Sequence, residues 1–412
     1  MDVLFVEVHL SPAGPDVPSP GSEGLRLSRE LGYRNVVLSA NPANYPARVH
    51  ELVDEWRRCD THSAAAMAAA ADGTDARGLL TFSDLFTGRA TSEAGRLLGL
   101  RAATPDAPAL ARDKSAVRRA LDGAGIPNPK WAVVPADERA PTSPIGFPCV
   151  VKPVDGLASW DVVRVADDRE LEEAVRAHRE RALYGGRVEP KHVLLLEEEL
   201  RGPLTSAEGF VDGDEVEIWG YSDRVLAGYP YFVEVRSTFS ADRPCAAADD
   251  FVRLVTKAAG YDFGAFHLEL ITTGDGPRLV ELNPRLIGGR AHLCLDHASG
   301  SDSIAYVLGR YLGESTVAPP RARRASTMRD LWVEEDGVVE AIVGAEEAAA
   351  VPGVEDLQLW VEPGAEVARP TSDGDLIGHV ITSGESGRES AAVAERAAAL
   401  IRVETVPRTR AS

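Results

Sequence analysis

The chain has 412 residues, 64 acidic and 44 basic side chains, a formal charge of −20 and 44% hydrophobic residues. This length suggests two or three packed α/β units, with ample room for a buried active site. The composition is that of a globular protein rather than of a disordered or fibrous one. The acidic balance argues against a nucleic-acid partner, because affinity for a phosphate backbone comes mainly from clustered Lys and Arg. We therefore expect a small-molecule ligand.

The cysteines and the N-terminus indicate where the protein works. The four cysteines lie far apart, with neither a C-x-x-C pair nor a spacing suited to zinc, which predicts reduced thiols. The opening run "MDVLFVEVHLSP" is short, alternates like a strand and carries no basic leader, so we expect neither a signal peptide nor a membrane span. Both features predict a cytoplasmic protein.

Residues 1–106 are expected to form a Rossmann-like N-terminal domain, because their pattern opens as strand, helix, strand. No G-x-G-x-x-G follows the first strand, so no dinucleotide is assigned there. An alanine-rich run at 64–71 is read as helix, and Ser92 is expected to cap the helix that follows it. The predicted strands are 2–8, 35–40 and 78–84, and the predicted amphipathic helices are 22–33 and 92–100.

Residues 107–194 are expected to form a small central α/β lid domain. A proline-bearing linker at 101–109 leads into a basic helix that stops at a glycine. The predicted strands that follow are "WAVVP", "FPCVVKPV" and "HVLLLEEEL", with a helix at 167–178 before the last of them.

Residues 195–412 are expected to form a larger C-terminal α+β domain. A hairpin around 264–283 lies at its centre. A β-rich tail subdomain is predicted from about residue 328, with an alanine-rich helix at 345–350 and a final helix over 389–403.

The hairpin "GAFHLELITTGDGPRLVELNPR", 264–285, carries the first chemical signal. Its two alternating runs flank "TTGDG", which is a turn signal. Alternation places His267 and Glu269 on one face of the first strand and Glu281 and Asn283 on one face of the second. Val280 and Leu282 are then expected on the opposite face. If the turn centres on Asp275, Glu269 and Glu281 face each other.

Two opposed carboxylates about 5 Å apart repel unless a cation lies between them. The oxygens of Glu269, Glu281 and Asn283 suit Mg²⁺, which keeps several waters and takes substrate phosphates as further ligands. Arg285 is then placed to contact a phosphate or a carboxylate, and Gly288–Gly289 lets a ligand approach the backbone. The alternative is an amphipathic hairpin whose acids face water. The N-P-R-x-x-G-G extension favours the metal, because a solvated edge has no use for it.

The run "HLEL…LVELNPRLIGG" closely resembles the metal-binding signature of the ATP-grasp ligases, especially their amino-acid and dipeptide ligase branch. The resemblance implies an ATP-grasp fold of α/β class. It also implies that Glu269, Glu281 and Asn283 hold Mg²⁺, for which Mn²⁺ can substitute, and that Arg285 stabilises the transferred phosphoryl group or a substrate carboxylate.

Other features that the family carries appear upstream in the expected order. Lys114 resembles the lysine that contacts nucleotide phosphate, and Lys152 the lysine on the strand before the phosphate-covering loop, in which Gly156 and Ser159 are retained. Both lysines belong to a minority of five among the basic residues, and a compact ammonium suits phosphate, although chance is the alternative. The stretch 194–202 resembles the strand whose backbone reads adenine, which places the base beside Glu197, Glu198 and Leu200.

Some positions depart from the family pattern. The loop 153–162 inserts Trp160 among residues that are usually small, and Leu204 stands where relatives commonly carry an acid for the ribose. Glu208 falls where the dipeptide branch often has an acid near metal or substrate; a surface strand residue is the alternative. His267 either contacts substrate or is a satisfied core histidine. Arg236 either holds a substrate carboxylate or forms a surface ion pair.

The implied activity is that of an ATP-dependent carbon–nitrogen ligase. A carboxylate attacks the γ-phosphate of ATP to give an acyl phosphate and ADP, and an amine then displaces phosphate, with amino-acid-type substrates and a small peptide-like product. The alternatives are a purine-pathway or carboxylase type of ATP-grasp ligase, or a non-catalytic ATP-binding regulatory protein. The expected partners are a small carboxylate and a small amine, with no nucleic acid or membrane. Relatives frequently dimerise, which makes a homodimer an expectation from the family alone.

Overall fold

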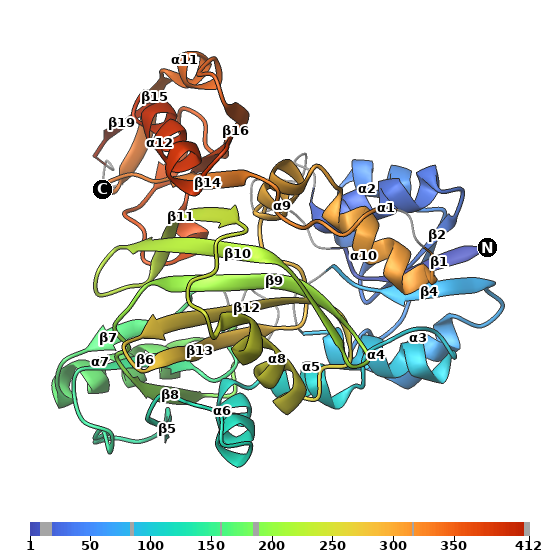
Figure 1. The fold of residues 1–412 in the computed structure, drawn as a ribbon, viewed down its shortest axis with the longest axis horizontal. Coiled ribbons are helices and arrows are strands. Elements are labelled where there is room, and N and C mark those ends of the chain that lie inside the picture. Colours follow the sequence, from blue (N-terminus) through green and yellow to red (C-terminus); the bar gives the residue numbers. More distant parts are fainter. Residues whose placement is uncertain (9–18, 83–85, 157–158, 184–188, 315–316, 408–412) are drawn as a thin grey trace, which may run out of the picture.

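The computed structural model describes residues 1–8, 19–82, 86–156, 159–183, 189–314 and 317–407. The described residues form four sheets, which follow the chain from the blue N-terminal part to the red C-terminal part in Figure 1. None of the helices in these ranges is both long and apolar enough to cross a membrane.

The N-terminal sheet is parallel, with strand order β3-β2-β1-β4, and the expected strand-helix-strand opening is confirmed. Every residue of β1 is buried, and its side chains feed apolar clusters on both faces of the sheet. The strands are β1 (Asp2–Val6), β2 (Arg34–Ser39), β3 (Glu55–Arg58) and β4 (Ala76–Leu80), and the helices are α1 (Pro20–Glu30), α2 (Ala47–Leu52), α3 (Ala64–Ala70) and α4 (Gly88–Leu97).

Two details of this region differ from expectation. The sequence pattern missed β3, whose residues lack an apolar run. The predicted cap at Ser92 is wrong, because α4 begins four residues earlier, after Thr87. Ala90 and Ala94 are buried, so packing draws the earlier turn into the helix and overrides the capping preference of serine. The last two residues of the predicted strand 78–84 lie outside the described residues.

The central sheet is antiparallel, with order β5-β8-β6-β7. Helix α6 begins after Asp113, whose carboxylate accepts from the backbone N–H groups of Ser115 and Ala116, and it ends at Gly123 as expected. The expected linker at 101–109 is partly helical, because α5 begins within it. The elements are α5 (Asp106–Ala111), α6 (Lys114–Gly123), β5 (Trp131–Pro135), β6 (Cys149–Pro153), β7 (Val163–Val165), α7 (Asp168–Glu180) and β8 (Val193–Glu198).

The largest sheet has eight strands, in the order β13-β12-β9-β10-β11-β14-β18-β16, and supplies one wall of the site described below. Helices α8 (Ala248–Ala258), α9 (His292–Ser299) and α12 (Gly387–Ala398) are packed along it (Figure 1). Its strands are β9 (Leu204–Asp212), β10 (Glu215–Ala227), β11 (Val233–Ser240), β12 (Phe263–Thr273), β13 (Gly276–Asn283), β14 (Ala325–Leu331), β16 (Val354–Leu359) and β18 (Gly378–Gly384).

Helix α10 (Ser303–Leu312) ties the C-terminal half to the N-terminal sheet. Its Leu308 and Leu312 are buried in the same apolar cluster as Phe5 and Val37. The sequence pattern gave no sign of this return of the chain.

The tail adds a three-stranded sheet, β17-β15-β19, and a short helix, α11 (Ala345–Ala349), as the alanine run predicts. The final helix, expected over 389–403, ends at Ala398, because the next residues form β19, which pairs with β15. These strands are β15 (Gly337–Val343), β17 (Glu366–Val367) and β19 (Arg402–Val406). The division at residues 106, 194 and about 328 remains our proposal.

A β-bulge sets the register of the hairpin. The turn pairs Thr273 with Gly276, and this register alone would bring Glu269 opposite Val280. The register shifts between Glu269 and Leu270, so that Val280 has no partner in β12 and Glu269 lies opposite Glu281. The expectation that Val280 faces the core is therefore wrong, and Leu279 takes that place.

The bulge also creates an acceptor for a buried ion cluster that joins the central unit to the large sheet. The carbonyl of Val280 accepts from Arg118 Nη2 at 3.0 Å and from Lys152 Nζ at 3.3 Å. Glu197 on β8 lies between the same two cations, with its Oε2 2.7 Å from Lys152 Nζ and its Oε1 bonded to Arg118 Nε. Burial alone would raise the pKa of Glu197, but the charges of Arg118 and Lys152 outweigh it and lower that pKa to about 2.

We predict that Glu197→Gln lowers the stability of the protein by about 3 kcal/mol at pH 7, because two buried cations lose their counter-charge. The folded pKa of about 2 lies below the ordinary value of 4.5, so the stabilisation is complete above pH 4.5 and is lost as pH falls toward 2. Urea unfolding midpoints at pH 7 and at several lower pH values measure the difference.

The matched control is Glu199→Gln, since Glu199 pairs with Arg164 at a more exposed place and should matter little. Equal midpoints for Glu197→Gln and the parent chain at pH 7 would contradict the prediction.

Candidate active site

The predicted metal ligands come together on one face of the hairpin. Glu269 and Glu281 are directly opposed, and Asn283 lies opposite His267 two pairs further along. Within the described parts of the chain, no group of three His, Cys, Asp or Glu side chains forms a complete metal site. Two carboxylates and one buried amide fit Mg²⁺ nonetheless, since this ion usually takes one or two protein carboxylates and completes its shell with waters and substrate phosphates.

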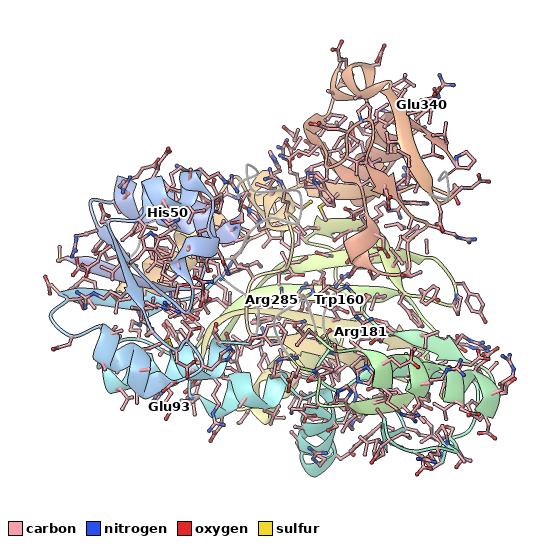
Figure 2. All side chains as sticks on the ribbon, turned by 180° about the vertical axis from the view of Figure 1, so that it is seen from behind. His50, Glu93, Trp160, Arg181, Arg285 and Glu340 are labelled. Carbon is pink, nitrogen blue, oxygen red and sulfur yellow. The ribbon has the colours of Figure 1, made fainter. Side chains whose placement is uncertain are left out.

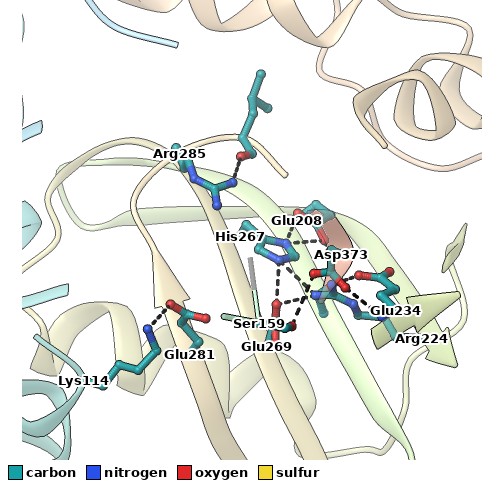
Figure 3. A network of polar contacts seen from close by, with 12 residues as sticks. Lys114, Ser159, Glu208, Arg224, Glu234, His267, Glu269, Glu281, Arg285 and Asp373 are labelled. Atoms are coloured by element: carbon teal, nitrogen blue, oxygen red, sulfur yellow. Dashed lines mark hydrogen bonds and ion pairs between the residues drawn. The ribbon is translucent and has the colours of Figure 1, made fainter. Parts of the chain in front are cut away.

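Lys114 connects this face to the phosphate-covering loop (Figure 3). Its Nζ lies 2.9 Å from Glu281 Oε1 and donates to the carbonyl of Gly156 at 2.7 Å. Lys114 is the first residue of α6, and its backbone N–H is held by the carbonyl of Val154 at 2.8 Å. One ammonium group thus lies between the loop and the metal-binding face, where nucleotide phosphates are expected.

Lys152 and β8, the strand expected to read the nucleobase, form the deeper part of the site. Burial lowers the pKa of Lys152, and Glu197 opposes that shift. The side chain of Glu197 is turned to the two cations, so only its backbone is left to read a base. Glu198 accepts from the backbone N–H of Lys130 at 2.9 Å, and Leu200 follows the end of β8.

His267 and Glu208 form a buried pair at the centre of the face. Nδ1 of His267 lies 3.0 Å from each carboxylate oxygen of Glu208, and Nε2 lies 3.2 Å from Glu269 Oε1. Burial opposes the charged imidazole, but the charge and hydrogen bond of Glu208 outweigh burial and raise the pKa of His267. His267 is buried, both of its ring nitrogens have partners on this face, and Glu208 orients it, so a contact with substrate remains a proposal.

Arg224 was not anticipated from the sequence. This β10 side chain forms ion pairs with Glu269 and with Glu234 of β11, and its Nη1 lies 3.1 Å from His267 Nε2. Burial would raise the pKa of Glu269, but Arg224 and His267 lower it well below its usual range. Arg224 and Glu234 carry no local motif. Only the pairing of strands far apart in sequence brings them to Glu269.

The loop after β6 reaches the tail of the chain. Ser159, in the left-handed backbone region with φ of 56°, donates to Asp373 Oδ2 at 3.3 Å. Asp161 anchors the other end of the loop to His178 and Arg181, whose charges outweigh burial and lower the pKa of Asp161 to about 2. Residues 157–158 of this expected lid lie outside the described residues. In the view from behind, Trp160 and Arg285 lie near the centre of the molecule (Figure 2).

Arg285 lies just beyond β13, and its Nη1 donates to the carbonyl of Leu286 at 2.8 Å. A Cβ built on Gly288 would meet this guanidinium at 3.4 Å, which is ordinary van der Waals contact, so the position of Arg285 does not by itself require a glycine there. Leu204 shares the site face with Ser206 and Glu208, as strand alternation requires, and it supplies no acid for a ribose.

A groove of about 600 Å³ lies on the opposite face of the large sheet, beside α12. The residues that line it include Tyr221, Asp223 and Arg236. Residues adjacent to these along the strands, such as Ser222 and Arg224, point to the face that carries the candidate site. Arg236 pairs there with Glu395 at 3.2 Å. Of the two roles considered for Arg236, the structure therefore supports the ion pair.

Comparison with known proteins agrees with this arrangement. Residues 145–293 match the model of the ATP-grasp domain, and residues 329–406 match the model of the L-amino acid ligase C-terminal domain 2. The protein y4rH of Sinorhizobium fredii is 30% identical over 392 residues, which cover 92% of this chain and 79% of that protein. The formate-dependent phosphoribosylglycinamide formyltransferase of Burkholderia thailandensis is 28% identical over 73% of this chain and 72% of its own length.

Among solved structures, the L-amino acid ligase from Bacillus licheniformis superposes with a TM-score of 0.77 at 21% identity, covering 99% of both chains. The sheets described above are thus those of the ATP-grasp fold, and the fold class expected from the sequence is confirmed. The chain belongs to the ATP-grasp family of ATP-dependent carboxylate–amine ligases, in the branch that includes the L-amino acid ligases.

Proposed function

We propose that the protein joins the carboxylate of an amino-acid-type substrate to an amine, with cleavage of ATP to ADP and phosphate. The observation that carries this proposal is the position of Lys114, whose ammonium touches both the loop carbonyl of Gly156 and the carboxylate of Glu281. A nucleotide phosphate placed there would meet a lysine, a covering loop and the oxygen ligands of a magnesium ion at once. The match to the C-terminal domain of L-amino acid ligases supports amino acids as the substrate class.

In the proposed reaction a substrate carboxylate attacks the γ-phosphate of ATP, and ADP leaves from the acyl phosphate. The amine then attacks the acyl carbon, phosphate leaves, and the amine nitrogen loses a proton. Lys114, Lys152 and Arg285 are proposed to neutralise the charge of the phosphates during transfer. When bound, Mg²⁺ would supply further neutralisation of phosphate charge from Glu269, Glu281 and Asn283. Mn²⁺ is expected to substitute.

His267 is proposed to act as a hydrogen-bond donor. Glu208 raises the pKa of His267 and so favours the protonated imidazole, which suits donation of a hydrogen bond better than acceptance of a proton from the amine. The loop that carries Ser159 and Trp160 is proposed to cover the acyl phosphate and keep water away from it, since this intermediate would otherwise hydrolyse. Burial of Lys152 in the ion cluster holds its charge in one place before any ligand binds, which is the condition for electrostatic catalysis.

A second candidate is a purine-pathway ligase, which the 28% identity to a phosphoribosylglycinamide formyltransferase favours. Formate and a phosphoribosylated amine would then replace the amino acids. Membership in a family of ATP-dependent ligases argues against the non-catalytic alternative.

We predict that purified protein releases ADP only when Mg²⁺-ATP, an amino-acid carboxylate and an amine are all present. Pools of amino acids and amines, with mass detection of condensed products, identify the productive pair. Glu281→Gln should lower the rate about 100-fold or more, because a proposed carboxylate ligand of Mg²⁺ is lost and Lys114 loses its partner. Asp275→Asn, at the exposed tip of the same hairpin, is the matched control and should retain activity.

Release with formate and phosphoribosylglycinamide alone would favour the purine-pathway candidate. Absence of release with every pool would contradict both proposals.

We further predict that removal of divalent metal with EDTA abolishes ADP release and weakens nucleotide binding itself. A ligand that binds only the folded state raises the melting temperature. Mg²⁺ with ADP should therefore raise it in the parent chain, and the rise should shrink with EDTA and in Glu281→Gln. Asp275→Asn should keep the full rise. A rise that is the same with and without metal would exclude the hairpin acids as part of the nucleotide site.

A further inference from the structure

The tail of the chain contributes a carboxylate to the site. A short 3₁₀ turn, Asp373–Asp375, brings Asp373 next to Glu234 and the phosphate-covering loop (Figure 3). Oδ1 of Asp373 accepts from the backbone N–H of Glu234 at 2.9 Å, and Oδ2 accepts from Ser159 Oγ at 3.3 Å. Asp375 shapes the turn from within, since its carboxylate accepts from the backbone N–H groups of Thr371 and Ser372. Asp373 is thus left to face the site.

A second tail carboxylate lies close by. Asp330 on β14 is 4% exposed, and strand alternation places it on the site face, because its neighbour Arg329 pairs with Arg236 on the groove face. The pKa of Asp330 is raised to about 7, mainly by burial and next by the negative charge of Asp373. The second cause reflects the proximity of the two acids. Within the described residues, the side chain of Asp330 has no bonded partner, and Asp373 has only the two neutral donors named above.

The other acids of this face are already matched with cations. Arg224 forms ion pairs with Glu234 and Glu269, and His267 forms one with Glu208. Asp330 and Asp373 therefore form a buried pair of acids to which no described cation is bonded, although the charge of Arg224 acts on both. Burying a carboxylate without a cation or a full set of hydrogen bonds is unfavourable, so a cation brought by a ligand would be bound strongly there.

We propose that Asp330 and Asp373 bind the ammonium group of the amino acid whose carboxylate is phosphorylated, an inference that rests on the proposed function. The nucleophilic amine must be unprotonated when it attacks, and two carboxylates would keep it charged and unreactive. The ammonium that they hold therefore belongs to the other substrate. In Figure 3, His267 lies between Arg285 and Asp373, an arrangement that suits a substrate with carboxylate and ammonium at opposite ends. The tail then selects the residue that becomes the N-terminal part of the product.

The test compares amino acids with their desamino counterparts as the phosphorylated acid: L-alanine with propanoate, L-leucine with 4-methylpentanoate and L-phenylalanine with 3-phenylpropanoate. The parent chain should prefer the best amino acid by roughly 100-fold in kcat/KM. Asp373→Asn and Asp330→Asn should each reduce that preference by roughly 10-fold or more and leave the KM for ATP unchanged. Calorimetric titration with the same acids, in the presence of Mg²⁺ and a non-hydrolysable ATP analogue, measures the preference without turnover.

Ser159→Ala is the matched control. It removes a hydrogen bond to Asp373 without removing charge, so it should keep the preference even if loop closure slows. If Asp373→Asn does not fold, Asp330→Asn, on a different element, decides the question. A folded variant that keeps the full preference for amino acids over desamino acids would overturn the proposal. A variant that keeps this preference but needs a different Mg²⁺ concentration would also overturn it. Equal use of amino and desamino acids by the parent chain would overturn it while the ligase stands, whereas no ADP release at all would reject the proposed function.

Discussion

The register shift at Val280 is the constraint on which the site depends. Without the register shift, Glu269 would lie opposite the apolar side chain of Val280, and Glu281 would fall one position away, on the other side of its strand. With it, the two carboxylates are opposed and the carbonyl of Val280 is freed from the ladder. Arg118 and Lys152 use that carbonyl, so the same bulge fixes the metal-binding face and the position of a lysine expected to contact phosphate. A local backbone irregularity thereby links two functional elements that come from different sheets.

The electrostatics of the face follow from this geometry. A buried carboxylate is tolerated when a cation lies beside it, and most acids here have one: Lys114 for Glu281, Arg224 for Glu269 and Glu234, and His267 for Glu208. These cations hold the acids in fixed positions before any ligand arrives. Such preorganisation reduces the reorganisation that binding and phosphoryl transfer would otherwise require. If Mg²⁺ binds as proposed, it shares Glu269 with Arg224, and the divalent ion is then an exchangeable part of the site rather than a structural one.

The sequence was most informative where chemistry is local. Alternation and the turn signal were enough to predict the hairpin and the opposition of Glu269 and Glu281, although the bulge that brings it about was not foreseen and Val280 was assigned to the wrong face. Helix α6 could be predicted as a basic helix that stops at a glycine. The cap at Ser92 could not, because buried alanines extended the helix beyond the residue with the best capping side chain. Strand β3 and the end of α12 were missed for a similar reason, since pairing with distant strands decided them.

The residues that the sequence could not indicate are those whose partners are remote. Arg224, Glu234, Asp330 and Asp373 sit in stretches with no motif, and only the order of strands in the large sheet brings them to one face. The tail strands β14, β18 and β16 extend that sheet instead of forming a separate body. Arg329 therefore pairs with Arg236 and Ser326 with Phe239 of β11, although these partners are 93 and 87 positions apart in the sequence. If Asp330 and Asp373 bind substrate as proposed, the eight-stranded sheet presents ATP-directed groups at one edge and substrate-directed groups further along. This division lets the tail change while the hairpin stays the same, which is a physical route by which one ATP-grasp framework can serve many carboxylates.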